Sequence, residues 1–226
     1  MVDQASRIPE PYGSDIYTEP DGEPDTLANL GPLAPMAGIW EGQVGDDVHP
    51  VVEGTEQNTF VERYELQPID RQTNGPQLFY GLRYHTHIVK PGEVETFHDQ
   101  VGYWLWEPAT ETVTLTLAIP RGQVLMASGP ATAEATEFEL TAAEGLETYG
   151  ILSNPFLLDA FRTTSFTMTV TTHPDGTWSY REVTTLLVAG RTEPYLHVDS
   201  STLVRIAPPT PNPLAIAAGL GATGAT

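Results

Sequence analysis

Residues 77–89 read QLFYGLRYHTHIV, and apolar and polar side chains alternate along this stretch. One face of an extended chain carries Leu78, Tyr80, Leu82, Tyr84, Thr86 and Ile88. This period of two residues is typical of a β-strand with one face on the protein interior. The stretch therefore predicts a strand whose opposite face, with His85 and His87, points to solvent or to a covering loop.

The same period recurs along most of the chain. Alternating segments, about ten in number, run from GIWEGQV (38–44) to YLHVDSSTLVRI (195–206). Short turns join them, such as HPDGT (173–177), in which Asp-Gly supplies the positive φ that a hairpin needs. A meander of antiparallel strands removes its exposed edges by closing on itself. The sequence thus predicts an all-β fold: a closed antiparallel up-and-down β-barrel of about ten strands with one or two short helices.

The ends of the chain differ in composition from its middle. Residues 1–29 are acidic and rich in proline and glycine, which predicts a flexible arm. Residues 208–226 are rich in proline, alanine and glycine, which predicts a flexible tail, and residues 30–207 form the predicted barrel domain. Within it, NLGPLAPM (29–36) predicts a plug over one end, and NPFLLDAFR (154–162) a short helix that closes an end.

A barrel of about ten strands is too wide for its side chains to fill, so we expect an enclosed ligand cavity. The 30 acidic and 10 basic residues give a net charge of -20, which disfavours nucleic acids and anionic membranes as partners. The chain has no cysteine, which excludes disulfides and thiolate sites. It shows neither a secretory leader nor a run of roughly 20 apolar residues, so we expect a soluble, cytoplasmic protein.

Five motifs resemble, in the same order, those of the nitrobindins, which are haem-binding β-barrels related in shape to fatty-acid-binding proteins. They are GIWEGQVG (38–45), the H-x-Q-x-G-Y pattern from His98 to Tyr103, AIPRGQVLMASG (118–129), DGTWSY (175–180) and EPYLHVDSSTLVR (193–205). The resemblance covers about residues 38–206. It departs from the family pattern at Val44, which stands where the third glycine of the first motif is expected.

The resemblance implies a haem b cofactor whose iron is bound by His197, in the last of these motifs. It also implies reaction with nitric oxide and isomerisation of peroxynitrite to nitrate, the activity of a peroxynitrite isomerase. No residue is assigned as catalytic. Near the haem propionates, where the family has a lysine, Arg162 is the nearest basic residue of this chain. The first motif adds Trp40, Gly38 and Gly42 to the expected cofactor-binding residues.

Other interpretations of the same residues stay open. His197 and Asp199 are two residues apart and therefore lie on the same face of the strand. His197 can equally be a core or rim histidine that hydrogen-bonds to this aspartate. A barrel with no metal chemistry would be a carrier or sensor of a hydrophobic small molecule, and a sealed one an interaction scaffold. His85 and His87 are spaced to share a metal ion, although we expect them to face outward.

The stretch FHDQVGYWLW (97–106) has aromatic residues on both faces. One face is expected to line the cavity and the other to lie beneath a loop or a second copy of the chain, as in a homodimer. His98 and Asp99 are adjacent in the strand and so point to opposite faces. The sequence therefore argues against a His–Asp dyad in this strand.

Overall fold

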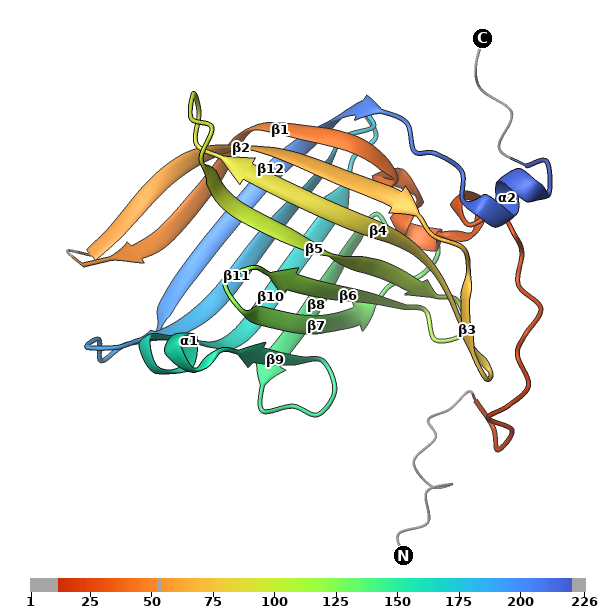
Figure 1. Cartoon of the computed structure of the whole chain (residues 1–226), viewed down its shortest axis with the longest axis horizontal. Helices are drawn as coiled ribbons and strands as arrows, with labels where there is room; N and C mark the ends of the chain where they lie inside the picture. Colours follow the sequence, from red (N-terminus) through yellow and green to blue (C-terminus); the bar gives the residue numbers. More distant parts are fainter. Residues whose placement is uncertain (1–11, 53, 221–226) are drawn as a thin grey trace, which may run out of the picture.

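The structure, a computed structural model, describes residues 12–52 and 54–220 and contains one twelve-stranded sheet that curls into a barrel (Figure 1). In chain order, the strands are β1 (Gly38–Val51), β2 (Gly54–Pro68), β3 (Gln72–Asn74), β4 (Gln77–Val89), β5 (Thr96–Glu107), β6 (Thr112–Ile119), β7 (Gln123–Pro130), β8 (Glu137–Glu144), β9 (Gly150–Ser153), β10 (Phe161–Thr172), β11 (Trp178–Val188) and β12 (Tyr195–Ala207). The helices are η2 (Leu27–Asn29), η3 (Gly31–Met36), α1 (Pro155–Ala160) and α2 (Pro213–Ala217).

Ten of these strands form the closed ring. The order is β2-β1-β12-β11-β10-β8-β7-β6-β5-β4, and pairing of β4 with β2 returns to the start. Every pair in the ring is antiparallel. The predicted closed barrel is therefore confirmed.

Two short strands depart from this pattern. β3 pairs only with β4, as the arm of a small hairpin, and β9 lies between β7 and β8 at one end. Because β9 runs parallel to β8, the whole sheet is mixed and not purely antiparallel. Both strands lie in the segments 68–77 and 146–159, which lack the alternating pattern that predicts the other strands.

The inner face of β4 carries the residues that the sequence pattern assigns to it. Tyr80, Leu82, Tyr84, Thr86 and Ile88 are buried, whereas the intervening His85 is exposed. Their burial places them in the same interior as side chains from the other ring strands, which form one core. The period of two residues thus predicted the orientation of this strand correctly.

One end of the barrel is closed by the η3 segment and by tryptophans. Leu33 and Met36 of η3 are fully buried, and the indole Nε1 of Trp40 donates to the Met36 carbonyl oxygen at 2.7 Å. Trp40 also makes an edge-on contact with Trp178, with 6.2 Å between ring centroids. The predicted plug is thus a 3-10 helix that seals this end.

Parts of the predicted flexible segments pack on this closed end. Thr26 and Asn212 are buried, and the Asn212 side chain accepts from the Thr26 backbone N–H at 3.1 Å. Its amide nitrogen donates to Asp70 Oδ1 at 2.7 Å. This asparagine therefore joins the two chain ends to the barrel, a long-range contact that local composition does not predict. Residues 1–11 and 221–226 of the predicted arm and tail lie outside the described residues. No helix within the described ranges has the length and apolar character needed to span a bilayer.

Candidate functional site

A cavity of about 650 Å³ lies at the end of the barrel opposite η3, and α1 borders it. Its apolar wall comprises mainly Phe60, Ile88, Phe97, Leu117, Ile119, Leu125, Phe161, Phe166, Met168 and Leu186. Its charged and titratable wall comprises Asp47, His49, Glu62, Tyr64, His98, Arg121, Tyr180, Glu182, His197 and Asp199. This volume lies within the range of about 300–1,000 Å³ that is typical of small-molecule sites. The predicted cavity therefore exists, and one part of it is acidic.

His197 lies on the cavity wall between two carboxylates. Its Nε2 is 2.8 Å from Asp47 Oδ1 and 3.3 Å from Asp199 Oδ2. Asp47 on β1 and Asp199 on β12 are direct cross-strand partners, so both point into the barrel beside the imidazole. The second oxygen of Asp47 contacts His49 Nδ1. A single buried carboxylate therefore orients two histidines.

Hydrogen bonding decides the charge of Asp47. Burial by itself would raise its pKa, but hydrogen bonds from His197, Asp199 and His49 outweigh this effect and lower the pKa to about 2. Burial and the neighbouring charge of Glu182 raise the pKa of Asp199 well above its ordinary value. The two aspartates thus differ: Asp47 is the carboxylate partner of the imidazoles, and Asp199 tends to keep a proton.

Two glutamates extend the acidic wall. Glu182 on β11 is the cross-strand partner of Asp199, and Glu62 on β2 accepts from the Tyr180 hydroxyl at 3.1 Å through Oε2. Removal from bulk water raises the pKa of each glutamate to about 7. The other oxygen of Glu62, Oε1, has no hydrogen-bond partner within residues 12–52 and 54–220.

His98 supplies a second imidazole to the same cavity. Its Nε2 lies 3.2 Å from Gln100 Oε1, and the amide of Gln100 donates to the Tyr84 hydroxyl at 2.7 Å. Burial lowers the pKa of His98, and the nearby charges of Arg121 and His197 lower it further. His98 is therefore neutral at physiological pH, and its ring is oriented by a polar chain.

Asp99 lies on the outside of the barrel, on the face opposite to His98, as the sequence predicted for the two neighbours. It contacts His85 Nε2 at 2.9 Å, and the side chains of His85 and Asp99 are 51% and 34% exposed. His87 also faces outward, with its Nε2 3.0 Å from Thr96 Oγ1. The structure thus separates His98 from Asp99 and keeps both outer histidines away from the cavity.

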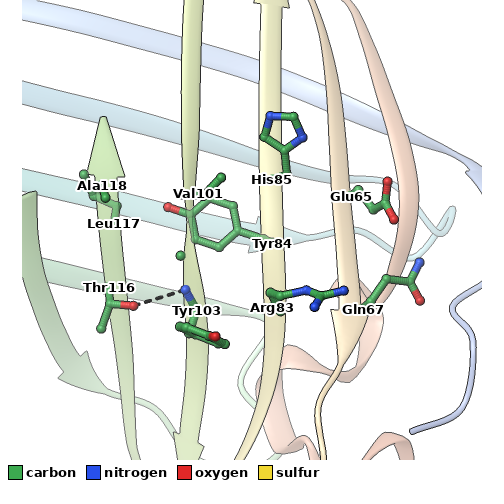
Figure 2. Close-up of a pocket in the computed structure, with 11 residues that line it drawn as sticks. Glu65, Gln67, Arg83, Tyr84, His85, Val101, Tyr103, Thr116, Leu117 and Ala118 are labelled. Atoms are coloured by element: carbon green, nitrogen blue, oxygen red, sulfur yellow. Dashed lines mark hydrogen bonds between the residues drawn. The ribbon is translucent and has the colours of Figure 1, made fainter. Parts of the chain in front are cut away.

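A second hollow, of about 640 Å³, lies on the outer face of the barrel over β2, β4, β5 and β6 (Figure 2). It opens over Gly102, where a Cβ would meet the Thr116 carbonyl oxygen at 1.9 Å. Arg83, Tyr103 and Glu65 are among the side chains around it (Figure 2). These are ordinary outward-facing residues with no convergent donor set, so we assign the candidate site to the inner cavity.

The remaining predicted site residues lie away from the cavity. Arg162 donates from Nε to both carboxylate oxygens of Glu144, at 2.9 and 2.8 Å. Trp40 and Gly38 lie toward the closed end, and a Cβ on Gly42 would meet Ser201 Oγ at 2.4 Å. None of these four residues lines the cavity.

Sequence reasoning missed four charged residues of the cavity wall: Asp47, Glu62, Arg121 and Glu182. The sequence did carry a signal for the glutamates. Glu62 is two residues from the apolar Phe60, and Glu182 is two residues from Tyr180, so each glutamate shares a strand face with an aromatic residue. An acidic residue at an inward position of an amphipathic strand indicates a polar cavity, since an ion is costly to bury in a packed core.

Comparison with known proteins places this barrel in a family. The chain matches the THAP4-like, heme-binding beta-barrel domain over residues 29–205. The chain belongs to this family. The nitrobindin-like resemblance of its five motifs is therefore confirmed. One solved structure, titled "Crystal Structure of Rv2717c from M. tuberculosis", is 19% identical and has a TM-score of 0.57. That match covers 82% of this chain and 99% of the other, and at this identity it supports the fold alone. A comparison with curated proteins finds no match.

The donor chemistry of the cavity fits the ligand that names the family. A porphyrin needs apolar contacts on its faces, an axial ligand for its iron and cations near its propionates. The wall supplies the apolar side chains, His197 supplies an imidazole, and Arg121 lies among the cavity-lining residues. A carboxylate bound to one ring nitrogen is the usual companion of a metal-bound histidine. Asp47 provides this partner to His197.

Proposed function

We propose that the cavity binds haem b and that His197 is the axial ligand of the iron. One observation carries the proposal: His197 lies on the cavity wall of a heme-binding family member, with Nε2 2.8 Å from a buried carboxylate. Asp47 fixes the tautomer, because a carboxylate accepts the proton of the nitrogen that faces it. The other ring nitrogen then keeps the lone pair that a metal requires.

The remaining cavity residues would orient the cofactor and exclude water. Phe60, Phe166 and Met168 provide apolar surface for the ring faces. Arg121 would pair with a haem propionate. It would take the role first expected of Arg162, because the guanidinium of Arg162 is already paired with the Glu144 carboxylate. Trp40, Gly38 and Gly42 would act indirectly, by shaping the barrel beneath the site.

Bound haem would supply an iron centre that reacts with nitric oxide and peroxynitrite. For this chemistry, which the nitrobindin-like family implies, the chain offers neutral groups on the cavity wall. His98 has a lowered pKa, and Glu62 and Glu182 have pKa values raised to about 7. Near neutral pH, the two glutamates can hold or release a proton at the cavity wall, and His98 can accept a hydrogen bond through its unprotonated ring nitrogen. We therefore propose peroxynitrite isomerisation as the reaction of the haem-loaded protein.

Titration with haemin tests the binding proposal. The wild-type protein should develop a Soret band with a one-to-one end point, and His197→Ala should lose the spectrum of the histidine-bound ferric iron. The double variant His85→Ala/His87→Ala is the matched control, because it removes two outward imidazoles and should leave the band unchanged. Absence of a Soret shift in the wild type would favour a carrier of a hydrophobic molecule without iron. An unchanged spectrum in His197→Ala would direct the test to His98.

Stopped-flow decay of peroxynitrite tests the reaction. The haem-loaded wild type should accelerate the decay and increase the nitrate yield, and the haem-free protein should not. Equal decay rates with and without haem would leave the cavity as a binding site without this activity.

A further inference from the structure

Three metal-ligating atoms converge on one point of the cavity wall. His197 Nε2, a carboxylate oxygen of Asp47 and one of Asp199 all lie within 4.8 Å of one another. The two aspartates are paired across β1 and β12, so the backbone register itself holds the donors together. This set differs from a surface cluster, because the side chain of Asp47 is 3% exposed and those of Asp199 and His197 are 21% and 29% exposed.

Around this point, acidic side chains outnumber basic ones. Asp47, Asp199 and Glu182 occupy one row across β1, β12 and β11. Within the described part of the chain, Arg121 is the only lysine or arginine that lines the cavity. Neighbouring carboxylates in a protein interior need a shared proton or a cation between them. The structure thus presents a row of acidic side chains that share protons, with the imidazoles of His197 and His49 beside it.

Glu62 gives a second, independent indication of a ligand at this wall. The residue is 1% exposed, and its Oε1 has no hydrogen-bond partner among the described residues, although the side chain lines the same cavity. A buried carboxylate oxygen without a partner is costly unless a proton, a water molecule or a cation satisfies it. A hydrated metal ion next to Asp199 would bring water molecules to this side of the cavity.

We propose that Asp47, Asp199 and His197 bind a divalent transition-metal ion directly when the cavity holds no haem. One imidazole and two carboxylates suit Mn²⁺, Fe²⁺, Co²⁺ or Zn²⁺, whereas Mg²⁺ and Ca²⁺ prefer oxygen donors alone. The cation replaces the proton between Nε2 and the carboxylates. The barrel would then be a site for two alternative kinds of metal centre.

Haem and the free cation exclude each other because they share His197. A neutral imidazole has one nitrogen with a lone pair, and the other nitrogen carries the proton. When Nε2 binds the cation, Nδ1 keeps the proton and cannot bind iron. Both sites use His197 and Asp47, but only the cation site needs Asp199 as a donor, so the Asp199→Asn variant lets the two proposals fail separately.

Isothermal titration of the haem-free full chain with Zn²⁺, and absorption spectra with Co²⁺, test the inference. The wild type should bind one ion per chain, with no comparable binding of Mg²⁺. Asp199→Asn should weaken Zn²⁺ binding by about 10- to 100-fold or more, because it removes a charged donor. The same variant should still develop a Soret band with haemin. In the wild type, Zn²⁺ should lower the apparent haemin affinity, and this competition should vanish in Asp199→Asn.

The outer pair of histidines provides the control. His85→Ala/His87→Ala removes the H-x-H donors on the outer face and should leave Zn²⁺ affinity unchanged. If Asp199→Asn does not fold, as judged by circular dichroism, Asp47→Asn replaces it with the same expectation for Zn²⁺. The inference would be overturned if the wild type bound no Zn²⁺, if the Asp199 or Asp47 variant bound Zn²⁺ as tightly as the wild type, or if only the outer double variant lost binding. None of these results would bear on haem.

Discussion

The two ends of the barrel interior are built on the same strands but hold opposite kinds of side chain. Toward η3, Trp40, Trp104 and Trp178 are fully buried and pack with leucines into a solid core. At the other end, the same strands turn Asp47, Asp199 and other polar groups into a cavity of about 650 Å³. The closed end therefore stabilises the fold, whereas the open end gives up stability to hold polar groups at a site.

The largest expected effect lies at the closed end. Trp40→Ala should reduce the free energy of unfolding by about 3–5 kcal/mol, because it removes a large buried side chain. It also removes the hydrogen bond to the Met36 carbonyl oxygen, which ties η3 to β1. Urea unfolding measures this loss, and Trp40→Phe, which keeps most of the ring, should lose clearly less. A loss below about 1 kcal/mol for the alanine variant would mean that this end is not the main source of stability.

The next effect lies at the open end, where a substitution should increase the free energy of unfolding instead of reducing it. Burial raises the pKa of Glu62 from 4.5 to about 7, so the native carboxyl keeps its proton over a range where the unfolded chain has lost it. Stability from this group is therefore complete below pH 4.5 and falls as the pH rises to 7, by at most about 1.4 kcal/mol per pH unit. Glu62→Gln should remove this dependence on pH, and its free energy of unfolding at pH 8 should be about 1–3 kcal/mol higher than that of the wild type.

Urea unfolding between pH 4 and pH 8 measures the difference between Glu62→Gln and the wild type. Glu65→Gln is the matched control, because Glu65 lies on the same strand but lines the outer hollow. Equal pH slopes in the wild type and in Glu62→Gln would mean that Glu62 is already ionised in the native cavity.

A smaller effect is expected where α1 borders the cavity. Asn154 caps this helix by accepting from the Leu157 backbone N–H at 3.0 Å, and its amide donates to the Arg121 carbonyl oxygen at 2.6 Å. Asn154→Ala should cost about 1 kcal/mol and speed the release of haemin, because both contacts at the cavity border are lost. Asn154→Asp keeps the cap and should recover most of the stability. Unchanged release by the alanine variant would show that α1 does not control access.

The closed end was largely predictable from sequence, because alternation of apolar residues reports which face of a strand is inside. Leu82 and Tyr84 are examples, and the same reasoning placed His85 outside. The small strands β3 and β9 were missed, since three- and four-residue strands carry too few residues for a period. The contact of Asn212 with Thr26 was missed because it joins residues far apart in the chain.

The open end was predictable only in part. The pattern placed His197 and Asp199 on one face, and their 3.3 Å contact agrees with this prediction. The pairing of His197 with Asp47 depends on the register of β1 against β12, which a β-bulge in β1 shifts. Local patterns do not encode such a register. The sequence alone therefore did not predict the acidic wall, because its residues meet only through the pairing of the strands.

A crystal structure of the haemin-loaded protein, with the iron located by its anomalous signal, would show whether His197 binds the iron inside the barrel. We expect one iron per chain inside the barrel, bonded to His197, with Asp47 still hydrogen-bonded to the same imidazole. Iron bonded to His98, or a haem seated in the outer hollow beside His85, would contradict it.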